Sequence, residues 1–155
     1  MKVGFSVIAL MLLFFSFAPP GSANTLIVQD VQSGGIIVFE KGGFTARLSG
    51  LEVPGLDHRL GLEIWDFTKK AVHGKIVQVF TWTTNNLASG IVRDEDGYPF
   101  VQIRFGKNWS QNLNEILLEK GYARVDEDYL PDDLQHYKEI EKEARDQKLG
   151  IWQQD

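Results

Sequence analysis

The chain has 155 residues, of which 43% are hydrophobic and 24% charged, a composition that excludes fibrous and disordered classes and indicates one globular domain. It contains no cysteine, which excludes a disulfide framework, a thiolate zinc site and a cysteine nucleophile. The formal net charge is −5 at pH 7. Because the average field of such a chain repels polyanions, nucleic acid could bind only at a local basic patch.

The first 23 residues have the three parts of a secretory signal peptide. Lys2 gives a positive start, residues 3–18 are almost wholly apolar, and Gly21 and Ala23 supply the small residues of a cleavage site. A membrane anchor is the alternative, but this apolar run is short for a hydrocarbon core of about 30 Å. The pattern therefore predicts cleavage after Ala23, a secreted or periplasmic location, and a mature domain of residues 24–155 without a transmembrane segment.

The first half of the mature chain has the pattern of a strand meander. Thr25–Val31 and Gly35–Phe39 are short β-branched runs on either side of a turn composition. From Phe44 to Ser49 apolar and polar residues alternate, as in a strand with one buried face. We expect three consecutive strands here.

The pattern then changes to a helix and back to strands. Residues 59–73 carry apolar side chains at helical spacing and are followed by Gly74, a natural helix end. Lys75–Thr81 and Leu87–Arg93 are the next expected strands. A tight turn at Asp94–Gly97 precedes one more strand, which contains Val101 to Phe105.

The last third is predicted to be helical. Asn112 and Glu115 resemble a capping box at the start of one helix, which Gly121 ends. Pro131 marks the start of a second helix, which runs to Gly150. About six short strands, one inserted helix and two trailing helices indicate a single α+β domain, mainly β, built on a small sheet or barrel.

Four ordered segments resemble the staphylococcal nuclease (thermonuclease) family. They are Arg47–Pro54, the helix and strand within 66–79, Asn114–Val125, and the Gly-x-Trp ending that closes 143–152. The resemblance covers about residues 26–152, essentially the whole mature chain. It implies a five-stranded oligonucleotide/oligosaccharide-binding (OB-fold) barrel with three helices.

The resemblance also implies particular chemistry. In that family two arginines clamp the phosphodiester, two carboxylates hold a calcium ion, and a glutamate prepares the attacking water. Arg47 matches the first arginine, and Glu52 stands where a metal-binding aspartate is expected. Tyr129 matches one of the tyrosines that stack on the substrate.

Three of the implied catalytic roles lack their side chain in this sequence. Gly34 and Gly35 stand in place of an Asp-Thr pair, so one metal carboxylate is missing. Gly55 replaces the water-activating glutamate, and Tyr98 replaces the second arginine. Losing a general base typically costs about 10²–10⁴ in rate, and losing one preorganised electrostatic contact about 10²–10³.

Each remaining candidate also has a structural interpretation. Arg47 could pair with Glu52 or Asp57 on the barrel surface, and such pairs are common. Asp57 and Glu63 are close enough in sequence to replace the lost acid, although a carboxylate about 1 Å out of place can cost about 10²-fold. The acidic residues within 126–133 are expected to form a solvated cap that repels nucleic acid.

Two functions of different classes follow from these residues. The first is an exported, catalytically degenerate nuclease-fold protein, a monomer without a cofactor that binds a protein or polysaccharide partner. The alternative is a secreted calcium-dependent phosphodiesterase (nuclease) that acts on DNA or RNA with a different set of acids. The replacements at Gly34, Gly55 and Tyr98 favour the first.

Overall fold

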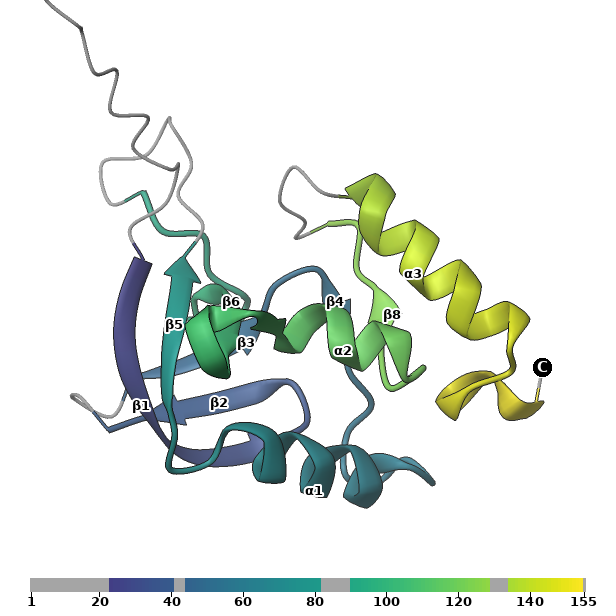
Figure 1. The fold of residues 1–155 in the computed structure, drawn as a ribbon, viewed down its shortest axis with the longest axis horizontal. Coiled ribbons are helices and arrows are strands. Elements are labelled where there is room, and N and C mark those ends of the chain that lie inside the picture. Colours follow the sequence, from purple (N-terminus) through teal and green to yellow (C-terminus); the bar gives the residue numbers. More distant parts are fainter. Residues whose placement is uncertain (1–22, 41–43, 82–89, 129–133, 155) are drawn as a thin grey trace, which may run out of the picture.

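The computed structural model describes residues 23–40, 44–81, 90–128 and 134–154 (Figure 1). The expected signal segment and Tyr129 lie outside these ranges. The strands are β1 (Ala23–Ser33), β2 (Ile36–Phe39), β3 (Thr45–Leu48), β4 (Leu51–Glu52), β5 (Ile76–Thr81), β6 (Phe100–Phe105), β7 (Gln111–Asn112) and β8 (Arg124–Val125). The helices are α1 (Gly61–Val72), α2 (Leu113–Glu119) and α3 (Leu134–Asp146), with short 3₁₀ turns at Lys107–Trp109 and Gly150–Gln154.

Five of the strands form a closed barrel. The order β3-β2-β1-β5-β6 is antiparallel throughout, and β3 also pairs with β6 in parallel, which joins the two edges. Arg47 lies opposite Phe100 in this closing pair. The α+β class and the five-stranded barrel with three helices are therefore confirmed.

Alternation along the strands places the core inside the barrel. In β2 and β3 every second side chain is buried and its neighbours are partly exposed, as expected for strands with one apolar face. The buried interior is large and almost wholly apolar: Val28, Val31, Ile37, Phe39, Ala46, Leu48, Ile64, Val77, Val79, Val101, Ile103, Leu113 and Leu117.

Helix α1 packs along one side of the barrel, below β1 and β2 in Figure 1. Its buried face contains Ile64, Thr68 and Val72, spaced by four residues as an amphipathic helix requires. The Thr68 hydroxyl donates to the Gly34 carbonyl oxygen over 3.3 Å. The turn between β1 and β2 is thereby fixed directly against the helix.

Helix α2 lies between the barrel and α3 (Figure 1). Asn112 caps it as predicted, with a side-chain oxygen that accepts from the Asn114 backbone N–H over 3.1 Å. Glu115, however, accepts from the Asn112 side chain and not from the cap backbone. The fully buried Asn114 side chain donates to the Ser49 carbonyl and accepts from the Ile103 N–H, which fixes α2 to the turn after β3 and to β6.

The chain after α3 folds back onto the domain, as the Gly-x-Trp ending implies. Trp152 is 4% exposed and packs with Ala144 and Ile151. The Arg124 and Arg145 guanidinium carbons lie 4.8 and 4.4 Å from its ring centroid. Its indole N–H has no hydrogen-bond partner among the described residues.

One predicted strand is not found where the chain can be described. Of Leu87–Arg93, residues 87–89 lie outside the described ranges, and the rest contribute only isolated bridging, such as that of Arg93 with Pro99. Within the described residues, no helix is both long enough and apolar enough to cross a membrane.

Candidate phosphate pocket

Arg47 projects from the barrel wall at the point where the barrel closes. Its neighbours Ala46 and Leu48 are fully buried, so strand alternation turns the arginine outward. The side chain is 37% exposed. The guanidinium group is therefore accessible from solvent, while the backbone that carries it is fixed on both sides by β2 and β6.

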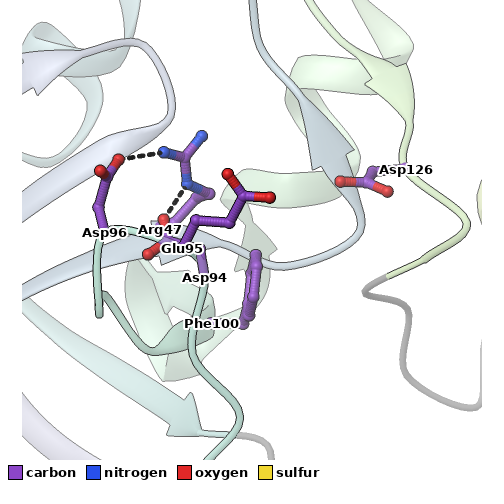
Figure 2. Close-up of a pocket in the computed structure, with 6 residues that line it drawn as sticks. All are labelled: Arg47, Asp94, Glu95, Asp96, Phe100 and Asp126. Atoms are coloured by element: carbon purple, nitrogen blue, oxygen red, sulfur yellow. Dashed lines mark hydrogen bonds and ion pairs between the residues drawn. The ribbon is translucent and has the colours of Figure 1, made fainter.

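Two carboxylates of a neighbouring turn hold the Arg47 guanidinium. Its Nε donates to Asp94 Oδ2 over 2.5 Å, and its Nη2 lies 3.6 Å from an Asp96 oxygen. Figure 2 shows the guanidinium reaching between these two acids. The Asp94 side chain is only 9% exposed, so this ion pair is partly shielded from solvent.

The turn that carries the two acids is internally ordered, and it is the tight turn predicted for Asp94–Gly97. Asp94 Oδ1 accepts from the Tyr98 backbone N–H over 2.8 Å, and the Asp94 carbonyl accepts from the Gly97 N–H over 3.0 Å. Gly97 has φ +83°, a left-handed conformation that favours glycine. Asp94 thus uses one oxygen to hold the turn and the other to hold Arg47.

Arg47 and this turn line a cavity of about 200 Å³. Its other lining residues are Phe100 from the closing strand and Asp126, which follows β8 and lies apart from the other acids in Figure 2. The walls carry four carboxylates, from Asp94, Glu95, Asp96 and Asp126, and one guanidinium. The field in the cavity consequently disfavours an anion.

The expected partners of Arg47 were wrong. The sequence suggested Glu52 or Asp57, whereas the ion pairs are with Asp94 and Asp96. The reason is the parallel pairing of β3 with β6, which brings the turn before β6 next to Arg47 across 47 residues of chain. Spacing along the sequence does not reveal such a contact.

Two other predicted positions do not line the cavity. Glu52 is exposed at the end of β4, where its backbone pairs with that of Arg124. Tyr98 is half-buried and holds the turn through its backbone. Among the described residues the structure thus brings Arg47 together with a set of acids but not with Glu52.

The position of the missing metal carboxylate has no room for a side chain. A Cβ atom on Gly34 would lie 2.5 Å from Ile64 Cγ2 and 2.9 Å from Val53 Cγ1, distances that real contacts do not show. Ile64 is fully buried, so it has little freedom to move aside. The β1–β2 turn packs directly on the core where the family resemblance implies a calcium ligand.

The position of the missing base is different. A Cβ atom on Gly55 would approach only Asp57, at 2.7 Å from Oδ1, the end of an exposed side chain. Glu63, the other candidate replacement acid, accepts a short hydrogen bond from the Tyr122 hydroxyl. Asp57 is therefore the nearer of the two to the position of the lost glutamate.

Calcium does not fit the residues present at the implied metal position. The ion takes about 6–8 oxygen ligands, whereas Gly34 offers no side chain and Glu52 is a single carboxylate. Across the part of the chain that the structure describes, no three histidine, aspartate or glutamate side chains are grouped so that they could hold a metal ion.

The sequence does not mark the acids around Arg47 as site residues. It predicts Asp94 and Asp96 only as parts of a turn, and Asp126 only as part of a solvated cap. The usable signal is that Asp94 stands at the start of the turn that the family resemblance places beside the phosphate clamp. Phe100 carries no such signal, because a single aromatic residue in a strand is most often core.

A closed five-stranded barrel with three helices and an arginine at the closing strands defines the class of OB-fold domains of the nuclease type. Residues 45–154 match the sequence model of the family described as staphylococcal nuclease homologue, and the chain belongs to that family. No curated protein matches the chain in a sequence search.

Proposed function

We propose that this protein is an exported, non-catalytic member of the staphylococcal nuclease homologue family that acts as a binding module. The observation that carries the proposal is the position of Gly34, where the core side chain of Ile64 leaves no space for a metal carboxylate. A residue lost by substitution alone would leave a vacant space, but here the backbone and the helix have closed over it.

The environment of Arg47 supports the same proposal. An arginine that stabilises a phosphoryl transition state must be free to meet charge that develops on the substrate. Arg47 instead pairs with Asp94 and Asp96, inside a cavity whose remaining charges are also acidic. Its resting partners therefore compete with substrate.

The proposed partner is a protein or polysaccharide, and the chain is proposed to act as a monomer without a cofactor. The net charge of −5 supports this choice against nucleic acid, because a polyanion approaches an acidic surface slowly. The pattern of Lys2, residues 3–18 and Ala23 supports export. Cleavage after Ala23 would leave a mature chain that starts within β1.

One observation favours the alternative, a calcium-dependent phosphodiesterase. Asp57 Oδ1 lies 2.7 Å from the position that a Cβ atom on residue 55 would take, so a carboxylate is present near the position of the lost base. If Asp57 prepared a water, cleavage would depend on both Asp57 and Arg47.

The test is hydrolysis of single-stranded DNA by the mature chain with millimolar calcium at mildly alkaline pH. We expect no cleavage above that of an Arg47→Ala variant prepared in the same way. Robust calcium-dependent cleavage that disappears in Arg47→Ala and in Asp57→Asn would establish the phosphodiesterase and reject the binding-module proposal.

A further inference from the structure

We infer that the Asp94–Gly97 turn is a built-in counter-anion that occupies Arg47 and closes the cavity to phosphate groups. The inference rests on the proposed function, since it treats the cavity as a binding site under internal inhibition. Its geometric basis is the pair of contacts from one turn to one guanidinium, Asp94 at 2.5 Å and Asp96 at 3.6 Å (Figure 2).

Carboxylate and phosphate compete for the same donors. The planar guanidinium presents its N–H groups in a fork that matches two oxygens of either anion. In this cavity Arg47 Nε and Nη2 already point at oxygens of Asp94 and Asp96. A phosphate that bound the Nε–Nη2 edge of the guanidinium would have to displace at least one of them.

The internal anion has two advantages over a phosphate from solution. Because it belongs to the same chain, its effective concentration is of millimolar order or higher. The Asp94 side chain is also 9% exposed, and a nearly buried carboxylate that loses its cation is left as an uncompensated charge, which is unfavourable. Displacing Asp94 is therefore more costly than displacing a solvated surface acid.

The rest of the cavity acts in the same direction. Glu95 and Asp126 line it without an ion pair to Arg47 among the described contacts, and each adds negative charge. These two acids repel an entering anion from a distance, whereas Asp94 and Asp96 block the donors themselves. The two pairs make separable contributions, which allows a matched comparison.

The experiment compares two double variants with the same change in net charge. Asp94→Asn with Asp96→Asn removes the acids that contact Arg47, and the amide oxygen introduced at position 94 can still accept from the Tyr98 N–H to hold the turn. Glu95→Gln with Asp126→Asn removes the two non-contacting acids. Inorganic phosphate is titrated into each mature protein while the Arg47 Nε–H signal is followed by nuclear magnetic resonance.

We expect phosphate to bind the Asp94→Asn/Asp96→Asn variant at least about tenfold more tightly than the unmodified chain, because the free fraction of the guanidinium sets the apparent affinity. The Glu95→Gln/Asp126→Asn variant should gain no more than about threefold, from the field alone. Adding Arg47→Ala to the first variant should abolish the gain.

Two results would overturn the inference: equal gains in the two double variants, or an unmodified chain that binds phosphate as tightly as Asp94→Asn/Asp96→Asn. Should the Asp94 variant not fold, Asp96→Asn alone is compared with Glu95→Gln, and a gain limited to Asp96→Asn is required. DNA cleavage by the unmodified chain would reject the proposed function without deciding this binding result.

Discussion

Arginines in two regions of the molecule are held by internal partners of opposite kinds. Arg47 is held by the carboxylates of Asp94 and Asp96 at the barrel surface, where β3 pairs with β6. Arg124 and Arg145 lie over the ring of Trp152, near the C-terminal end of the described residues. The first region contains Arg47, the implied phosphate clamp, and the second is formed by packing around a buried ring.

The difference shows which part of the family pattern the fold itself requires. The Trp152 region keeps the Gly-x-Trp motif because the buried indole ring fills a large volume of the packed interior. The residues around Arg47 can change without loss of the barrel, since the turn and the cavity lie on its surface. We therefore expect stability to depend on the second region, and the proposed function to depend on the first.

The largest expected effect is the loss of the Trp152 ring. Trp152→Ala should lower the free energy of unfolding by about 3–5 kcal/mol, because a buried ring is removed and two guanidinium groups lose the surface they cover. Denaturant midpoints of the mature chain and the variant measure this. Trp152→Phe is the control, and it should lose less, because the indole N–H has no partner among the described residues. Equal midpoints for Trp152→Ala and the unmodified chain would show that this region adds no stability.

The second prediction concerns Gly34, the position where the proposed function lacks a metal carboxylate. Gly34→Asp should destabilise the protein by about 1–3 kcal/mol, because its Cβ atom would overlap Ile64 in a packed interior. Gly55→Glu is the matched control and should change the free energy of unfolding by less than about 0.5 kcal/mol, since its Cβ atom meets only the end of the Asp57 side chain. If both variants are equally stable, the metal position is open and the proposed reason for lost catalysis is wrong.

The fold could be predicted from the sequence to a large extent because its signals are local. Alternation in residues 44–49, helical spacing in 59–73 and the Asn112 cap each specify one element, and the order of the family segments specifies how they assemble. Two predictions differ in the described part: α3 ends at Asp146 and not at Gly150, and the predicted strand at 87–93 is not found there. Of that expected strand, the described residues 90–93 make only isolated bridging, such as that of Arg93 with Pro99.

The site could be predicted only in part, because its contacts are distant in sequence. The sequence identifies Arg47, but its partners Asp94 and Asp96 become neighbours only when β3 closes on β6. The overlap that a Cβ atom on Gly34 would have with Ile64 likewise involves residues distant in sequence, and it depends on how closely α1 packs against the β1–β2 turn. The predicted roles of Glu52 and Tyr129, and cleavage after Ala23, stay predictions.

A third, smaller effect is expected for a polar contact of the framework, between Tyr122 and Glu63. Burial of the Tyr122 ring and its hydrogen bond to the Glu63 carboxylate raise the pKa of Tyr122 to about 12, from 10.0 for a free side chain. Because the folded-state pKa is the higher one, this contact stabilises the fold fully below about pH 10 and loses that effect as the pH rises toward 12.

Spectroscopic titration of the tyrosines, compared with Tyr122→Phe, identifies this group. Glu63→Gln should bring the pKa of Tyr122 closer to 10.0, while the contribution of burial persists. A Tyr122 that titrates at its ordinary pKa in the unmodified chain would contradict the contact.

The smallest expected effect is that of the ion pair between Lys69 and Asp30, which joins α1 to β1 over 3.1 Å. The Val31 backbone N–H and then Lys69 lower the pKa of Asp30, so this carboxylate stabilises the fold above its ordinary pKa of 3.8 and loses that effect as the pH falls through its lowered value.

The Lys69 and Asp30 side chains are both partly exposed, so Lys69→Met should lower the free energy of unfolding by only about 0.2–1 kcal/mol, with the difference reduced in high salt. Lys70→Met removes the exposed pair with Asp66 and serves as the control. A Lys69→Met loss as large as that of Trp152→Ala would mean that surface charge, and not packing, holds α1 on the barrel.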